Sequence, residues 1–188
     1  MKEQEFTNQL IALVRPSLVD AKVDTGMSVL YEMQVDEDGK VRMGVDSDTG
    51  EPIRGRGTGF EQDLLIYEDA AESQTSVVPR VIAEVKYGGV TTHDAIVYSS
   101  KAESIKRVYP YCRYGMILGD FRTIPGRVLR HGRHFDFVCA LRVPLVESEL
   151  EHLKALLISE LASSRQIAAL LKGKTKVRVF HRGMTARQ

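Results

Sequence analysis

Two apolar segments of strand length carry charged residues where a buried strand normally has none. Segment 62–68 (QDLLIYE) holds Asp63 beside three aliphatic residues, and segment 77–87 (VVPRVIAEVKY) holds Glu84 and Lys86. Because side chains alternate between the two faces of a strand, Glu84 and Lys86 are expected to project on the same face. An ionised side chain inside an apolar element is costly unless it is paired, hydrogen-bonded or bound to a metal ion. These charges therefore indicate a function rather than a requirement of folding.

The order of the predicted elements indicates an α/β domain with a mixed central β-sheet flanked by helices. Hydrophobic periodicity predicts helices over 3–21, about 92–108 and 147–171, and Pro16 could kink or end the first of them. Turn residues and apolar runs predict a hairpin of strands 28–35 and 41–45, and further strands over 62–68, 77–87, 113–119, 135–143 and 176–180. Residues 46–59 and 123–133 are expected to be loops. We expect one domain over residues 1–188, with its core in about 1–145 and a C-terminal helix and basic tail in 146–188. The leucine stripe of helix 147–171 fits either the core or a dimer seam.

Composition is typical of a soluble globular protein, with 43% hydrophobic and 27% charged residues. Cys112 and Cys139 lie in apolar runs without the spacing of a metal site, which favours reduced core cysteines and a cytoplasmic location. No stretch approaches 18 uninterrupted apolar residues, and the N-terminal residues contain no apolar signal core. We therefore expect neither a membrane span nor export.

Charge is unevenly distributed along the chain, although the formal net charge is only +1. Residues 1–75 hold 16 acidic and 7 basic side chains, whereas residues 101–134 hold 8 basic and 2 acidic ones. From residue 161 to the end there are 7 basic residues and no acidic ones. Such a distribution predicts a basic face of the kind that binds a polyanion. The alternative is that the basic side chains only solvate the surface.

Asp63, Glu84 and Lys86 form the pattern D-(x20)-E-V-K. This pattern resembles the motif of the PD-(D/E)xK nuclease superfamily, whose members have the restriction-endonuclease-like fold. The resemblance covers roughly residues 1–120, with a helix before the two strands and a helix and a strand after them. The chain departs from the motif at Gln62, where the family has a proline.

The resemblance implies a Mg²⁺-dependent nuclease, with Mn²⁺ as a possible substitute and DNA as the expected substrate. Asp63 and Glu84 would bind the metal ion together with the backbone carbonyl of Val85, because hard cations prefer oxygen ligands. Lys86 would orient the attacking water or contact the scissile phosphate. A single catalytic domain would need two copies to cut both strands, so a homodimer is expected.

Further site residues are less clearly identified than Asp63, Glu84 and Lys86. An additional acidic residue is expected from the first helix or the hairpin, with Glu5 and Glu32 as candidates. Lys101 lies on the helix after the motif and is a candidate for nucleic-acid contact. Arg54 and Arg56 are candidates for the same contact on a different ground, because they lie in a glycine-rich loop before the motif that could approach a phosphate backbone or be a plain turn. Each of these has the plain alternative of a solvated surface residue.

Basic residues in segment 123–133, including Arg127, Arg130 and Arg133, could also contact DNA phosphates or simply decorate a loop. Two other functions remain open at this point. One is a catalytically inactive member of the same fold that binds nucleic acid or protein. The other is an unrelated α/β protein whose buried charges are structural.

Overall fold

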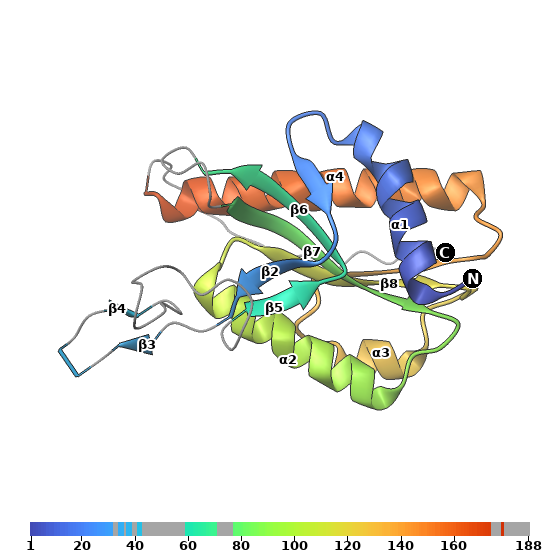
Figure 1. The fold of residues 1–188 in the computed structure, drawn as a ribbon, viewed down its shortest axis with the longest axis horizontal. Helices are drawn as coiled ribbons and strands as arrows, with labels where there is room; N and C mark the ends of the chain where they lie inside the picture. Colours follow the sequence, from blue (N-terminus) through green and yellow to red (C-terminus); the bar gives the residue numbers. More distant parts are fainter. Residues whose placement is uncertain are drawn as a thin grey trace.

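A five-stranded mixed sheet forms the centre of the computed structural model, which describes residues 1–31, 34–35, 37–38, 41–42, 59–70, 77–173 and 178. The strand order is β1-β6-β7-β8-β9. These strands span Lys22–Asp24 (β1), Leu64–Asp69 (β6), Val77–Tyr87 (β7), Arg113–Gly119 (β8) and Phe137–Leu141 (β9) (Figure 1). The predicted α/β class, with a mixed sheet flanked by helices, is confirmed.

Strand direction changes in the middle of this sheet. β1 and β7 both run antiparallel to β6, whereas β7, β8 and β9 run parallel to one another. Parallel neighbours need a crossover connection. Helix α2 (Thr92–Val108) connects β7 to β8, and the short helix α3 (Gly126–His131) lies between β8 and β9. The side chain of Thr91 caps α2 by accepting a hydrogen bond from the backbone N–H of Asp94 at 3.1 Å.

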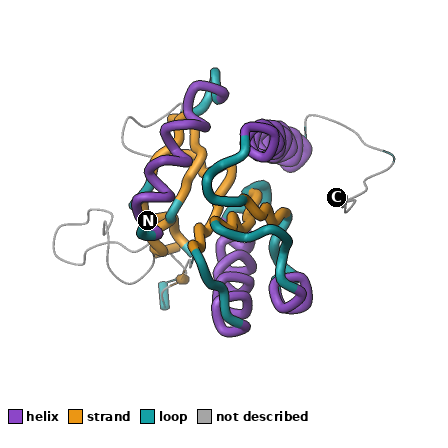
Figure 2. Tube along the Cα trace, turned by 90° about the vertical axis from the view of Figure 1, so that its right-hand side faces the viewer, coloured by secondary structure: helices purple, strands orange, loops and turns teal. Residues whose placement is uncertain are grey.

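Helices cover both faces of the sheet. Figure 2 shows α1 (Glu3–Val14) and α4 (Glu147–Leu171) on one face and α2 and α3 on the other. Successive side chains of β7 point alternately to these two layers of helices. Val81, Ala83 and Val85 pack in the core that includes α1 and α4, whereas Ile82 packs with apolar residues of α2. Glu84 follows the parity of Ile82 and therefore faces α2.

The leucine stripe of α4 belongs to the core. Leu153 and Leu157 are completely buried and Leu161 is nearly so, in the same apolar cluster as Phe6 and Leu10 of α1. This arrangement answers the alternative between core and dimer seam in favour of the core.

Two small sheets accompany the main one. β2 (Met27–Leu30) pairs antiparallel with β5 (Gly59–Gln62), and β3 (Gln34–Val35) pairs antiparallel with β4 (Val41–Arg42). The predicted hairpin is thus confirmed in its centre, but its first strand is divided between two sheets. Of the predicted loop 46–59, residues 46–58 lie outside the described residues and Gly59 begins β5.

Several predicted boundaries were wrong. The first helix ends at Val14 rather than 21 and continues as a 3-10 turn, Arg15–Ser17, since Pro16 has no N–H for a helical hydrogen bond. Segment 123–133 contains α3, strand 135–143 shortens to β9, and β1 was not predicted. The predicted strand 176–180 lies outside the described residues except for Arg178. The bounds of β7, β8 and α4, by contrast, agree with the prediction.

The two cysteines carry free thiols, and burial raises the pKa of Cys112 to about 12. Over the described ranges, no helix combines the length and the apolar character needed to cross a bilayer.

Candidate functional site

The pairing of β6 with β7 brings Asp63 to Glu84. The sequence predicted Asp63 inside a strand, but the residue lies at the bend between β5 and β6. Leu64 lies opposite Ala83, so the preceding residue lies beside the Glu84–Val85 peptide. Oδ2 of Asp63 accepts a hydrogen bond from the backbone N–H of Val85 at 2.8 Å. This bond fixes the carboxylate against β7.

Glu84 is a buried carboxylate held by two donors. Its side chain is 2% exposed, and Oε1 accepts hydrogen bonds from Nζ of Lys101, at 2.9 Å, and from the hydroxyl of Tyr114. Burial raises the pKa of Glu84, and nearby Asp63 adds to this effect. The Lys101 charge and the Tyr114 hydrogen bond lower that pKa but do not outweigh burial, so it stays raised.

Lys86 shares the α2 face with Glu84 but contacts a different acid. Its Nζ lies 3.0 Å from Oε1 of Glu3 and 5.1 Å from the ring centroid of Tyr98. Burial alone would lower the pKa of Lys86, but its interactions with Tyr98 and Glu3 outweigh that effect and raise it. Lys86 is therefore a protonated hydrogen-bond donor at neutral pH, not a proton acceptor.

The two lysines of the site pair with different acids. Lys101, not Lys86, makes the ion pair with Glu84. The ring centroid of Tyr98 lies 5.1 Å from Nζ of Lys86 and 5.1 Å from Nζ of Lys101. The ring centroid of Phe60 lies 5.0 Å from Nζ of Lys101. Lys101 had been predicted to contact nucleic acid, but its side chain is only 18% exposed and points to Glu84. Lys101 is therefore part of the candidate site, where it neutralises Glu84.

Glu3, rather than Glu5, is the α1 acid at this site. One oxygen of Glu3 pairs with Lys86, and the other accepts from the backbone N–H of Tyr87 at 3.3 Å. Glu5 is exposed and accepts from the backbone N–H of Lys2 at 2.9 Å, so it caps the helix. A signal for Glu3 was present in the sequence. It lies three residues before Phe6 and four before Thr7, both buried, and therefore shares their face of the helix.

Three predicted site residues, Glu32, Arg54 and Arg56, lie outside the described residues. Their predicted roles stay predictions.

The oxygen donors around Asp63 suit a hard divalent cation. Asp63 Oδ1 and Glu84 Oε2 form no hydrogen bond with a described residue. Gln62 is 1% exposed, and its Oε1 also has no hydrogen-bond partner among the described residues. No group of three or more His, Cys, Asp or Glu side chains suited to a metal ion occurs in the described part of the chain. Two carboxylates would thus be completed by oxygens from the backbone, water or substrate.

We expect Tyr114→Phe to lower the free energy of unfolding by about 1.5–3 kcal/mol, because it removes a hydrogen bond to a buried carboxylate. Urea unfolding followed by circular dichroism measures the change. Tyr67→Phe is the matched control, since the Tyr67 hydroxyl donates at 2.7 Å to Asp24, whose side chain is 44% exposed. Equal losses in the two variants would show that burial of Glu84 does not strengthen its bond to Tyr114.

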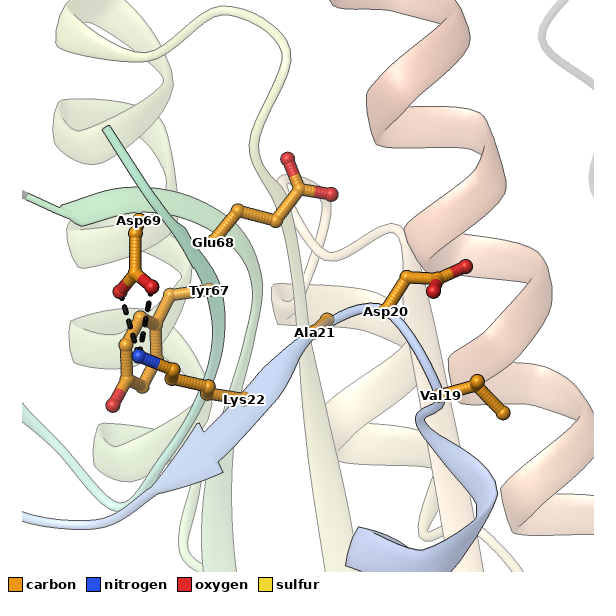
Figure 3. A pocket seen from close by; sticks show the side chains of 7 residues that line it. All are labelled: Val19, Asp20, Ala21, Lys22, Tyr67, Glu68 and Asp69. Atoms are coloured by element: carbon orange, nitrogen blue, oxygen red, sulfur yellow. Dashed lines mark hydrogen bonds and ion pairs between the residues drawn. The ribbon is translucent and has the colours of Figure 1, made fainter. Parts of the chain in front are cut away.

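A cavity of about 220 Å³ lies at the other end of β6, away from these carboxylates. It is lined by Val19, Asp20, Ala21, Lys22, Tyr67, Glu68 and Asp69. Its charged groups are largely paired. Nζ of Lys22 is 2.8 Å from both carboxylate oxygens of Asp69 (Figure 3), and Glu68 bonds to Arg80 and Arg165. The candidate site is therefore not in this cavity.

The chain matches no protein-family model, and no curated protein matches it. The geometry of Asp63, Glu84 and Lys86 thus carries the functional argument.

Proposed function

We propose that this chain is a Mg²⁺-dependent nuclease that hydrolyses phosphodiester bonds and acts on DNA as an endonuclease, in the manner of the PD-(D/E)xK superfamily. The observation that supports it most is the juxtaposition of two carboxylates, Asp63 and Glu84, with a lysine that stays charged. Hydrolysis of a phosphodiester needs a cation to offset phosphate charge and a donor to stabilise the transition state. The site supplies residues for both tasks.

Each residue has a role in this proposal. Asp63, Glu84 and the carbonyl of Val85 would hold the metal ion, which when bound lowers the pKa of a water molecule and offsets negative charge on the phosphate. Lys86 would donate a hydrogen bond to a non-bridging oxygen of the scissile phosphate. Glu3 orients Lys86, since it bonds both to Nζ of that lysine and to the next backbone N–H.

Two further parts of the proposal concern the whole protein. We propose that it acts in the cytoplasm and that cleavage of both DNA strands requires two copies of the chain. Size-exclusion chromatography with and without a DNA duplex tests the second part.

Conversion of supercoiled plasmid to nicked and linear forms tests the proposed reaction. The wild-type protein is expected to cleave in Mg²⁺ or Mn²⁺ and to stop in EDTA. A closed circular substrate is required because it has no ends, so any cleavage of it is endonucleolytic. Cleavage that persists in EDTA would argue against a metal-dependent reaction.

A second candidate, an inactive member of the same fold that binds nucleic acid, is favoured by the state of Glu84. Its Oε1 is already held by Lys101 and Tyr114, so the charge of this carboxylate has a partner without a metal ion. Such a protein would bind DNA in a salt-dependent way without turnover.

Thermal unfolding in increasing Mg²⁺ separates the two candidates. A ligand that binds only the folded state stabilises it, by about 2.7 kcal/mol at a hundred times its Kd. The nuclease proposal expects Tm to rise with Mg²⁺ in the wild type and much less in Glu84→Gln. An unchanged Tm in both proteins would support the inactive candidate.

A further inference from the structure

A group of arginines that the candidate site does not use lies after β8. Four arginines fall within residues 120–134, in the loop before α3, in α3 itself and in the turn after it, and all four are exposed: Arg122, Arg127, Arg130 and Arg133. Asp120 is the one acidic residue in that segment of the sequence. We name residues 120–134 the arginine segment.

These four arginines differ from others of the domain because none of them makes a direct ion pair with a described carboxylate, although Arg133 is close enough to Glu103 to help lower the pKa of that carboxyl group. Six arginines elsewhere each form an ion pair: Arg15, Arg80, Arg107, Arg113, Arg142 and Arg165. None of the four in the arginine segment forms a hydrogen bond or ion pair with a side chain that the structure describes. Positive charge is therefore concentrated here, with only Asp120 in the segment and Glu103 near Arg133 and His134 to offset it. Such a concentration attracts a polyanion.

The arginine segment is anchored to the fold. Val128 of α3 is 1% exposed and packs with Val90, Met116 and Leu118. Residues 127 and 130 are three apart on α3, so their side chains are neighbours on its exposed surface. The guanidinium groups of Arg127 and Arg130 therefore project from a helix that is packed against the core.

The arginine segment begins at the same edge of the sheet as the candidate site. Gly119, the last residue of β8, pairs with Tyr87, which directly follows Lys86. The backbone N–H of Gly88 donates to the carbonyl of Gly119 at 2.9 Å. Figure 1 shows α3 alongside α2, the helix that carries Lys101, and both helices cover the same face of the sheet in Figure 2.

We propose that the arginine segment binds the phosphate backbone of DNA and so holds the substrate beside the candidate site. The choice of DNA as partner rests on the proposed nuclease function. Guanidinium groups make bidentate hydrogen bonds to phosphate oxygens, and such contacts position a duplex without reading its sequence. The surface thus supplies affinity that the carboxylates of Asp63 and Glu84, which repel phosphate groups, cannot supply.

Salt-dependent DNA binding by the full chain tests this surface. Fluorescence anisotropy with a labelled mixed-sequence duplex is measured in EDTA, which prevents cleavage, for the wild type and for Arg127→Gln/Arg130→Gln. Each phosphate contact contributes about −0.9 to the slope of log K against log salt. Loss of two contacts should reduce the slope by about 1.8, so the affinity lost between about 50 and 200 mM salt becomes about 12-fold smaller.

The matched control is Arg107→Gln/Arg142→Gln, which removes the same charge from arginines that already have carboxylate partners. We expect its salt slope to stay close to that of the wild type. Equal slopes in the two double variants would overturn the proposal, because net charge alone would then explain binding. Wild-type binding to phosphatidylserine vesicles but not to the duplex would overturn it as well.

Failure of this inference can be told apart from failure of the proposed function. Plasmid cleavage by the wild type, combined with unchanged DNA binding in Arg127→Gln/Arg130→Gln, rejects the arginine surface alone. Arginine-dependent DNA binding without any metal-dependent cleavage supports the surface and rejects the nuclease.

Discussion

Replacing Lys86 with alanine is expected to slow single-turnover cleavage of DNA by about 100- to 1000-fold, the usual cost of removing one donor that stabilises transition-state charge. The structure explains why this lysine can act as a cation. Its bonds to Glu3 and Tyr98 raise its pKa despite burial, so Nζ keeps its proton at neutral pH. The measurement is the rate of plasmid nicking at saturating enzyme in Mg²⁺.

Two variants make the Lys86 result specific. Lys22→Ala removes a lysine that pairs with Asp69 at the far end of β6 and is expected to leave the rate unchanged. Glu3→Gln keeps Lys86 but weakens its tether, and an intermediate loss is expected. Because the Glu3 side chain is 42% exposed, it can be solvated when Lys86 is absent, and the fold should survive. A Lys86→Ala rate equal to that of Lys22→Ala would contradict the assigned role.

The second large effect is expected on stability, from Asp136→Ala. The carboxylate of Asp136 lies 2.7 Å from Nζ of Lys106 and 3.0 Å from Nη1 of Arg113, and it accepts the backbone N–H of Tyr114 at 2.8 Å. All three charged side chains are mostly buried, at 9%, 20% and 15% exposure. Arg113 would still pair with Glu160, but Lys106 would lose its carboxylate partner. Removing one partner of a buried ion pair costs about 3–5 kcal/mol because the other charge is left uncompensated.

Equilibrium urea unfolding measures the effect of Asp136→Ala. Burial already lowers the pKa of Lys106, and the nearby Asp136 charge opposes that decrease, so the variant should also make Lys106 easier to deprotonate. The control is Asp69→Ala, which breaks an exposed pair with Lys22 and should cost no more than about 1 kcal/mol. A loss below about 1 kcal/mol for Asp136→Ala would show that this network is not needed for stability.

The sequence allowed the long elements to be predicted because their patterns are local. β8 is an apolar run after Arg113, and β7 is mostly apolar although it carries Glu84 and Lys86. α4 has a leucine stripe at helical spacing that ends before Gly173. The short elements gave no such signal. β1 has three residues, and α3 has a single buried side chain, Val128, among arginines and glycines.

The site residues also differ in whether a local pattern in the sequence reveals them. Glu84 and Lys86 were predicted from charges inside an apolar strand, which is a local conflict visible in the sequence. The partner of Lys86 is not local, since Glu3 is 83 positions away, and only its helical spacing to buried residues placed it on the inner face. The Lys101–Glu84 pair depends on how α2 crosses the sheet, which sequence periodicity does not determine.

The most direct test of the central claim is Mg²⁺-dependent cleavage of closed circular plasmid by the wild type and by Asp63→Asn. Asparagine keeps the size of the side chain and an oxygen that can still accept the Val85 N–H, but it removes the negative charge that would bind the metal ion. We expect the wild type to nick and linearise the plasmid and Asp63→Asn to leave it supercoiled, with both proteins unfolding at similar temperatures. Equal cleavage by the two proteins would contradict the assignment of this site.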